Sequence, residues 1–288
     1  MLLERHTRWL DAVEPDEGEQ ATLHERGVPA AFVRHALDVA EQPRIQHDGA
    51  GASLVVFRVP EADGPGGKAI ALAIVVRGEQ IVTIASQRLA LLDRVAPTDA
   101  GMVPAVWLPE LVHAVVAAFD ARLDTVDREV ERLEQTLRTS QRNAEVLALL
   151  ECQKALVHLE RALAADVGLV ERLRDDATLA FDPAARRRLD AALVELRQTL
   201  QMTTISAEIL ASMMDAFASI ISNNLNHAMK LMAAVMIMLS IPTMVAGLWG
   251  MNVPLPGGGQ PWAFAAIVAV LGLASLAVGL LFRRRRWL

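Results

Sequence analysis

The chain has 288 residues, 53% of them hydrophobic, with 28 Lys and Arg against 34 Asp and Glu and a formal net charge of −6. This acidic balance, without a basic stripe, argues against nucleic-acid binding. The single cysteine, Cys152, excludes an intrachain disulfide and a multi-cysteine zinc site, and it fits a reducing compartment. A mean hydropathy of +0.30 is high for a soluble protein, although 22% of the residues are charged. The charged residues are therefore expected to be unevenly distributed along the chain.

The first part of the chain, to about residue 104, is predicted to be a small α/β module. Apolar spacing predicts a helix over 30–40, with Pro29 at its first turn. Short β-branched runs predict three strands, at 54–59, 69–76 and 80–85. The glycine cluster at 64–67 lacks the spacing and the following helix of a phosphate-binding loop. It is interpreted as a hairpin connection between the first two strands.

From Trp107 onward the pattern is helical, with helices predicted over 107–139 and 143–176. A third helix is predicted to begin with Asp182 as N-cap and Pro183 at its first position. No Pro or Gly interrupts 184–241, so this helix is expected to continue into the apolar part of the chain as a rod of about 90 Å. A rod of this length needs other helices or other subunits to pack against it.

Residues 231–282 include no charged side chain. A Pro- and Gly-rich segment, 253–261, separates two apolar stretches, 231–249 and 262–282, of 19 and 21 residues. About 20 apolar residues cross the hydrocarbon of a bilayer as a helix. Neither stretch has the polar face that a buried core helix of this length normally shows. Two transmembrane helices joined by a short loop are therefore predicted.

The flanking charges predict the orientation. Lys230 precedes the first span and the arginines of 283–286 follow the second, and basic residues beside spans mark the cytoplasmic face. Both termini are expected inside, in a multi-pass protein of the plasma (inner) membrane, and no secretory signal peptide is recognised. The predicted domains are a cytoplasmic α/β domain (1–104), a cytoplasmic helical or stalk domain (105–230), a first span (231–252), an outer loop (253–261), a second span (262–282) and a basic tail (283–288).

Two groups of polar residues in the cytoplasmic part are weighed against ordinary surface roles. An acidic stripe with steps of 4 and 3 shares one helical face: Asp120, Asp124, Asp127, Glu131 and Glu134. It would concentrate divalent cations near a pore entrance, but interleaved arginines favour a solvated face. His227 is interpreted as a helix-surface imidazole and Cys152 as an inert thiol. No nucleophile set, metal-protease helix or nucleotide fingerprint is found, so no enzyme is predicted.

One seam of the first helix follows alternating steps of 3 and 4: Asn226, Met229, Ala233, Met236, Ser240, Thr243, Gly247 and Gly250. All small or polar residues of the span except Ala234, Pro242 and Ala246 fall on it. Lipid would not select such a face, whereas a close helix–helix contact or a water-lined pore would. Periodicity leaves both interpretations open. Pro242 frees a backbone carbonyl, which is tolerable where neighbouring helices or pore water satisfy it.

The outer end of the span has the sequence Gly250-Met251-Asn252. Hard cations such as Mg²⁺ take oxygen ligands and lose their waters reluctantly. A ring of amide and backbone oxygens is therefore expected to hold such an ion through its hydration shell without a carboxylate.

Segments 223–230, 241–252 and 282–288 resemble the CorA-type divalent-metal-ion transporters, a two-span family with a Gly-Met-Asn signature. The order of the parts is similar over essentially the whole chain. The resemblance implies an α+β cytoplasmic domain, a long stalk helix and two transmembrane helices in a funnel-shaped homopentamer. It also implies channel-like uptake of Mg²⁺, and of Co²⁺ and Ni²⁺, gated by cytoplasmic Mg²⁺ and without a covalent cofactor. The implied partners are the lipid membrane, the metal ions and further copies of the chain.

The resemblance implies roles for particular residues. The selectivity filter would be Gly250, Met251 and Asn252. The pore lining and gate would be Asn226, Met229, Met232, Met236, Ser240, Thr243 and Gly247, with the three methionines as the apolar gate. A regulatory metal contact would fall near Asp190. Two alternative functions stay open. Segment 256–259 resembles the ZntB-type zinc transporters instead, which leaves Zn²⁺ uptake as an alternative. A non-conducting membrane-anchored coiled-coil scaffold or metal sensor is a more remote alternative.

Overall fold

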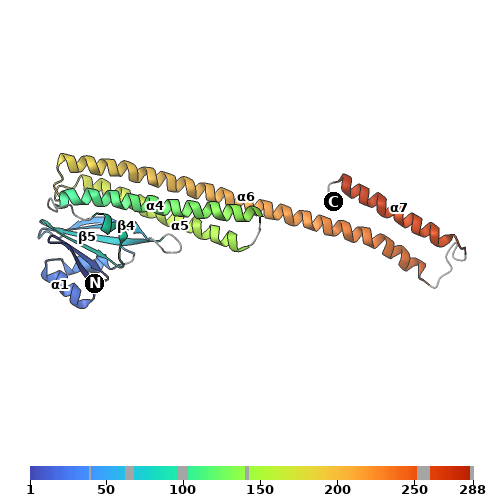
Figure 1. Ribbon diagram of the computed structural model, residues 1–288, viewed down its shortest axis with the longest axis horizontal. Coiled ribbons are helices and arrows are strands. Elements are labelled where there is room, and N and C mark those ends of the chain that lie inside the picture. The colour runs from blue at the N-terminus through green and yellow to red at the C-terminus, as the bar shows by residue number, and fades with distance from the viewer. Residues whose placement is uncertain (39, 62–67, 96–102, 140–142, 252–259, 286–288) are drawn as a thin grey trace. The chain divides into compact units, whose positions relative to one another are not determined.

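A computed structural model gives the fold for residues 1–38, 40–61, 68–95, 103–139, 143–251 and 260–285 (Figure 1). The chain forms two compact units, Met1–Met214 and Asp215–Leu288. Helix α6, Pro183–Trp249, begins in the first unit and ends in the second. The other described elements of the first unit are β1 (Leu2–His6), β2 (Trp9–Val13), α1 (Glu17–Glu25), α2 (Ala30–Ala36), β3 (Arg44–His47), β4 (Ala52–Pro60), β5 (Ala69–Arg77), β6 (Gln80–Ala85), α3 (Ala90–Arg94), α4 (Pro104–Thr139) and α5 (Asn143–Arg174).

A six-stranded sheet with the order β1-β2-β6-β5-β4-β3 forms the centre of the first unit. Strands β2 and β6 pair in parallel and all other neighbours are antiparallel. Strands β4 and β5 are buried on both faces, which is why their sequences are nearly continuous apolar runs. Helices α1 and α2 cover one face of the sheet, and α4 and α5 cover the other (Figure 1).

The three strands predicted from sequence are confirmed as β4, β5 and β6. The helix predicted over 30–40 begins as predicted at Ala30, with Pro29 as its N-cap, but it is shorter because α2 ends at Ala36. Strands β1 to β3 were not predicted, since they are only four or five residues long and two of them are only half-buried. The glycine cluster of 64–67 lies outside the described residues.

The long helices begin and end close to the predicted positions. The carboxylate of Asp182 accepts a hydrogen bond from the backbone N–H of Ala185 at 2.6 Å, which confirms Asp182 as the N-cap of α6. Helix α5 ends at Arg174, two residues earlier than predicted. The reason is Asp176, whose carboxylate accepts from the backbone N–H groups of Thr178 and Leu179 and so stabilises a turn.

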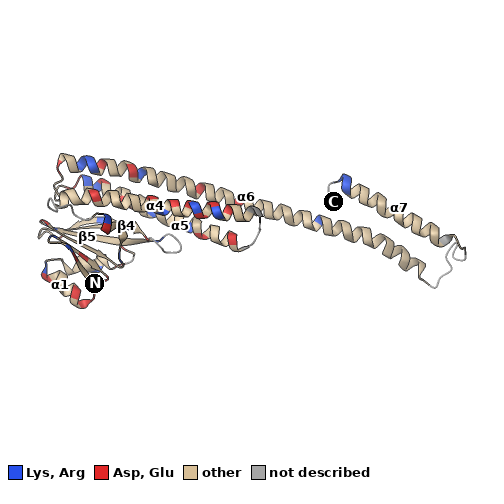
Figure 2. Ribbon diagram, viewed as in Figure 1, with Lys and Arg blue, Asp and Glu red and all other residues tan. Residues whose placement is uncertain are grey.

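Three described helices are long and apolar enough to cross a membrane by length and composition: α4, α6 and α7 (Ala263–Arg284). Half of the apolar stretch of α4 is buried inside the first unit, against 6% for α6 and none for α7. The apolarity of α4 is therefore explained by its contact with the sheet. The charged residues end at Lys230 and resume at Arg283, so the apolar parts of α6 and α7 are uncharged throughout (Figure 2).

Candidate functional site

In the second unit, α7 covers one face of α6. Ala234 is fully buried beneath it, and Met238 approaches so closely that a side chain at Gly279 of α7 would lie 3.7 Å from its sulfur. The other α6 residues that α7 partly covers are Ile241, Pro242 and Val245. Successive helical residues are about 100° apart, so these residues form a single face.

The predicted seam lies on the opposite face. All of its members from 226 to 247 are exposed in the single chain: Asn226, Met229, Ala233, Met236, Ser240, Thr243 and Gly247. At about 100° per residue, Met236 and Met238 are separated by roughly 200° around the helix. Helix α7 is therefore not the partner of the seam. A Cβ atom added at Gly247 would meet nothing within 4 Å. Together with the exposure of the other seam residues, this shows that the seam face of α6 is open in the single chain.

Two hydroxyls in the seam are oriented by the helix itself. Ser240 donates to the carbonyl of Ile237 at 2.9 Å and Thr243 donates to the carbonyl of Leu239 at 2.7 Å. A hydroxyl that donates its hydrogen internally keeps its oxygen lone pairs as acceptors. Both oxygens can therefore accept hydrogen bonds from water, including water in the first shell of a cation.

At its C-terminal end, α6 stops at Trp249 and one further turn follows. The backbone N–H of Gly250 donates to Ala246 at 3.0 Å, and that of Met251 donates to Leu248 at 3.4 Å. A Cβ at Gly250 would make only ordinary contacts, 3.4 Å or more, so packing within one chain does not require glycine there. Asn252, the third residue of the predicted filter, lies outside the described residues.

Near the start of the apolar stretch of α6, the three methionines predicted as a gate are all exposed: Met229 (59%), Met232 (64%) and Met236 (66%). Their steps of 3 and 4 place them on one side of α6. His227 is also exposed on the helix surface. Burial and nearby Glu129 raise the pKa of the Cys152 thiol on α5, which keeps it protonated at neutral pH.

The acidic stripe of α4 faces α6 as well as solvent. Thr199 of α6 donates to the carboxylate of Asp120 at 2.6 Å, and Ser206 donates to that of Asp127 at 3.4 Å. Asp120, Asp124 and Asp127 line a groove of about 250 Å³ together with Glu195 and Thr199 of α6. Burial raises the pKa of Asp127, with further contributions from the negative charges of Asp124 and Glu131.

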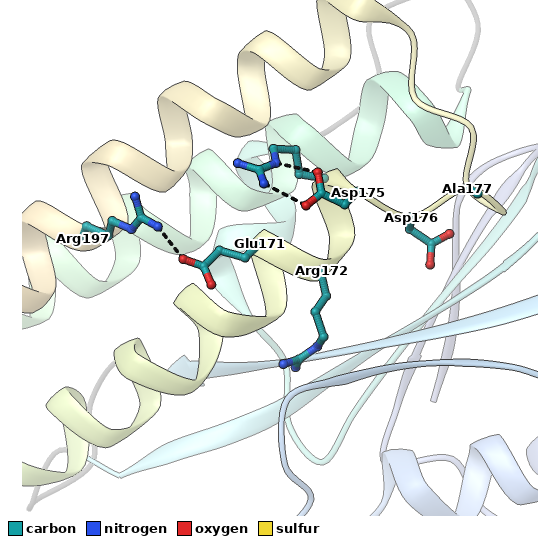
Figure 3. A pocket seen from close by; sticks show the side chains of 7 residues that line it. Glu171, Arg172, Asp175, Asp176, Ala177 and Arg197 are labelled. Carbon is teal, nitrogen blue, oxygen red and sulfur yellow. Dashed lines mark hydrogen bonds and ion pairs between the residues drawn. The ribbon is translucent and has the colours of Figure 1, made fainter.

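An open groove of about 580 Å³ lies where α5 ends, lined by Glu171, Arg174 and Arg197 among others (Figure 3). Asp190, the predicted regulatory residue, contacts this groove through Arg174. Its carboxylate is 3.4 Å from Arg174, which also binds Asp175 at 2.8 Å. Arg197 and Glu171 form a second ion pair across the groove. Within the described parts of the chain, no group of three or more His, Cys, Asp or Glu side chains is arranged to hold a metal ion. A cation at Asp190 would have to displace Arg174.

The structure brings together a hydrogen-bonded Ser–His–Asp set that the sequence spacing does not reveal. His47 is 2.8 Å from the hydroxyl of Ser53 and 3.0 Å from the carboxylate of Asp176. Ser53 is only 3% exposed, at the start of β4, and its hydroxyl is held by His47, so it is not placed as an accessible nucleophile. This hydrogen-bonded set links β3 and β4 to the turn after α5, so its role is to hold these segments together.

The fold and the open polar face define a class of protein: a membrane protein in which one long helix joins an α/β unit to a hairpin of apolar helices. The chain matches the family described as CorA-like Mg²⁺ transporter protein over residues 4–284, and it belongs to that family. This is a family of divalent-cation transporters rather than of enzymes. The family predicted from the sequence resemblance is therefore confirmed.

Two similar proteins are both described as cobalt/magnesium transport protein CorA. The one from Methanocaldococcus jannaschii is 22% identical over 292 aligned positions, which cover 97% of this chain and 91% of the relative. The one from Thermotoga maritima is 24% identical over 189 positions, which cover 63% of this chain and 52% of the relative.

Solved structures confirm the predicted fold class. The complete structure of the CorA magnesium transporter from Methanocaldococcus jannaschii matches with a TM-score of 0.85 at 22% identity, covering 97% of this chain and 91% of that one. The full-length CmaX protein matches with a TM-score of 0.73 at 20% identity, covering 97% and 88%. The ZntB cytoplasmic domain from Vibrio parahaemolyticus is more distant, with a TM-score of 0.57 at 13% identity, covering 73% and 87%. The α/β unit, the long helix and the C-terminal apolar helix are common features, and the homopentamer stays a prediction.

Proposed function

We propose that this protein is a channel-like transporter that carries hydrated Mg²⁺, and also Co²⁺ and Ni²⁺, into the cytoplasm. The observation that carries the proposal is the open face of α6, on which Ser240 and Thr243 offer oxygen atoms while α7 covers the opposite side. A helix face with exposed polar groups is costly against lipid and favourable against water. The descriptions of both relatives as cobalt/magnesium transport proteins support the choice of ions.

The open face requires further copies of the chain. In the first unit, α6 has a separate stripe of exposed apolar residues: Val194, Met202, Ile205 and Ile209, with exposures of 63%, 48%, 40% and 57%. An exposed apolar stripe on a long helix is what a self-association interface presents. A homopentamer would pack this stripe between subunits and would place five copies of the open face around one pore.

The proposed arrangement in the membrane follows the charge pattern. The α/β and helical domains (1–104 and 105–230) and the basic tail (283–288) lie in the cytoplasm, and the loop (253–261) lies outside the plasma membrane. The spans are 231–252 and 262–282. Gly250, Met251 and Asn252 form the outer filter, and Met229, Met232 and Met236 form the inner apolar gate. Cytoplasmic Mg²⁺ bound near Asp190 between subunits would favour the closed state by replacing the contact with Arg174.

Zinc is the second candidate ion. The loop of 253–261 contains no Asp or Glu, and its Pro-Gly-Gly-Gly run resembles the ZntB branch. The retained Met251 of the Gly-Met-Asn motif favours Mg²⁺ and Co²⁺.

The test is metal uptake into proteoliposomes that contain the full-length protein and a fluorescent divalent-ion indicator. Asn252→Ala is expected to reduce Mg²⁺ uptake by at least about tenfold, because the amide that contacts the hydrated ion is lost. Gln260→Ala, which removes an amide from the adjoining loop, is the matched control and should leave uptake unchanged. Adding Co²⁺, Ni²⁺ or Zn²⁺ in competition identifies the preferred ion. Uptake that is unaffected by Asn252→Ala would remove Asn252 from the filter, and no uptake by the unmodified protein would refute the transporter.

A further inference from the structure

Helix α6 packs against α4 and α5 through one seam whose chemistry changes along its length. The seam positions recur at strictly alternating steps of 3 and 4: Leu189, Ala192, Leu196, Thr199, Thr203, Ser206 and Leu210. All are at most 4% exposed except Ser206, which is half-buried. This is the spacing of a helix seam in a coiled coil, where apolar residues normally occupy every position. Three successive positions here carry hydroxyls instead.

These hydroxyls make the contacts between the helices in this stretch. Thr199 donates to Asp120 of α4, and Ser206 lies 3.4 Å from Asp127 of the same helix. Beside the seam, Thr204 donates to Glu160 of α5 at 2.9 Å. Thr203 is fully buried but donates to the carbonyl of Thr199 in its own helix at 2.8 Å. In the segment from Thr199 to Ser206, three hydroxyl–carboxylate contacts thus join α6 to α4 and α5 where a coiled coil would have apolar contacts.

Such contacts hold a helix less strongly than leucine packing does. A buried leucine is stabilised by the apolar area removed from water, whereas water can replace either partner of a hydroxyl–carboxylate bond. Water in the neighbouring groove reaches one edge of this seam, because Thr199 lines that groove together with Asp120, Asp124 and Asp127. Asp127 is itself partly removed from water, which adds a desolvation cost to the packed state. The hydroxyl stretch is thus the weakest part of the contact between α6 and the α4–α5 pair.

We propose that residues 199–206 form a release segment, at which α6 parts from α4 and α5 during transport while the part from Leu189 to Leu196 stays packed. This role rests on the proposed function, because α6 is the helix that continues to the pore face. Parting at the release segment must also release Leu210, the one apolar seam residue that follows it, while the apolar contacts from Leu189 to Leu196 stay intact. The freed hydroxyls and carboxylates then form hydrogen bonds to water.

The first experiment measures parting directly, in full-length protein reconstituted in nanodiscs without Mg²⁺. Thr203→Cys and Leu193→Cys, each in a Cys152→Ser background, replace residues of 0% and 3% exposure in the two halves of the contact. The thiol at position 203 is expected to react with a maleimide about tenfold faster than the thiol at position 193. Equal protection of both thiols would overturn the release segment, whether or not the protein transports metal.

The second experiment locks the seam and measures flux. Ser206→Cys with Asp127→Cys, joined by a short bis-methanethiosulfonate crosslinker in proteoliposomes, is expected to lower Mg²⁺ flux at least about tenfold, and dithiothreitol should restore it. The control pair is Arg188→Cys with Glu110→Cys, an α6–α4 ion pair of 2.7 Å in the half that stays packed, where crosslinking should leave flux unchanged. Undiminished flux through the locked release segment would refute its role in transport. Absence of flux before crosslinking would refute the proposed function instead, and the labelling experiment would still decide whether the segment parts.

Discussion

At the scale of single residues, Asp166 is the side chain whose burial has the clearest cost. It lies on α5, is 0% exposed, and accepts a hydrogen bond from the backbone N–H of Arg58 at 3.0 Å. Strand β3 pairs with β4 only as far as Val56, so Asp166 satisfies a backbone group of β4 beyond the end of β3. Its second carboxylate oxygen has no hydrogen-bond partner among the described residues. Burial raises the pKa of Asp166 well above its ordinary value, although Arg58 opposes the shift.

Asp166→Asn should therefore stabilise the protein at high pH. An acid whose pKa is raised in the folded state loses stability as pH rises from its unfolded pKa, near 3.8, through the folded value. The amide still accepts the Arg58 hydrogen bond but never ionises, so we expect a gain of about 1 to 3 kcal/mol at pH 8 that shrinks toward pH 5. Thermal unfolding of the full-length protein, followed by tryptophan fluorescence at both pH values, measures this. Asp175→Asn at an exposed ion pair is the control, and a less stable Asp166→Asn protein at pH 8 would contradict the prediction.

At the scale of elements, α6 carries different contacts on different faces and in different stretches. Its first part packs on α4 and α5, and its last part packs on α7 through Ala234 and Met238. The uncovered part of α6 in the second unit includes the seam with Ser240 and Thr243, beside exposed apolar residues such as Leu239. A single helix can serve these contacts because its faces repeat every 3.6 residues and its composition changes along its length.

The open seam predicts the effect of a hydroxyl deletion at Thr243. Thr243→Leu removes an acceptor for the water around an ion and adds bulk to the open face, so we expect Mg²⁺ flux to fall by about tenfold or more. Thr243→Ser keeps the hydroxyl and should retain most of the flux. The measurement is initial-rate uptake in proteoliposomes with matched protein content. If the leucine variant transports as fast as the serine variant, Thr243 does not face the ion pathway.

At the scale of the whole molecule, charge and apolar surface are separated along the chain. The 28 basic residues less the four of 283–286 leave 24 against 34 acidic residues, a charge of −10 through Lys230. The four arginines that follow the second apolar stretch account for the remaining +4. An acidic part before the membrane and a basic tail after it suit a protein that attracts cations on one side and anchors at the membrane surface.

If the exposed apolar stripe of α6 is the interface between subunits, a charged residue placed in it should weaken subunit association. Ile209→Glu places a carboxylate in an apolar stripe that we expect to be buried between subunits, so the pentamer should dissociate or weaken by at least about a hundredfold in subunit affinity. Leu147→Glu, at a position on α5 that is 63% exposed and outside the stripe, is the matched control. Native mass spectrometry in detergent reports the subunit number directly. A pentameric Ile209→Glu protein would exclude this stripe as the interface.

Elements with strong local signals were predictable from the sequence. The uncharged stretches of α6 and α7, the β-branched runs of β4 to β6 and the Asp182 cap are each encoded within about 20 neighbouring residues or fewer. The family resemblance rests on equally local motifs. The burial of Asp166 was harder to predict. Its sequence signal is a single carboxyl among apolar residues on one side of α5, and spacing alone does not distinguish such a residue from a surface residue.

The tertiary structure decided which of these elements pack against one another. Helix α4 is apolar enough to span a membrane by length and composition, and its contact with the sheet explains that apolarity. The acidic stripe, the hydroxyl seam and the α7-covered face of α6 are periodic in sequence, but periodicity does not name the neighbour. His47 and Asp176 are 129 residues apart in the chain and meet only because β3 lies beside the end of α5. Sequence determines which faces are apolar or polar through local chemistry, whereas the pairing of faces depends on packing between distant segments.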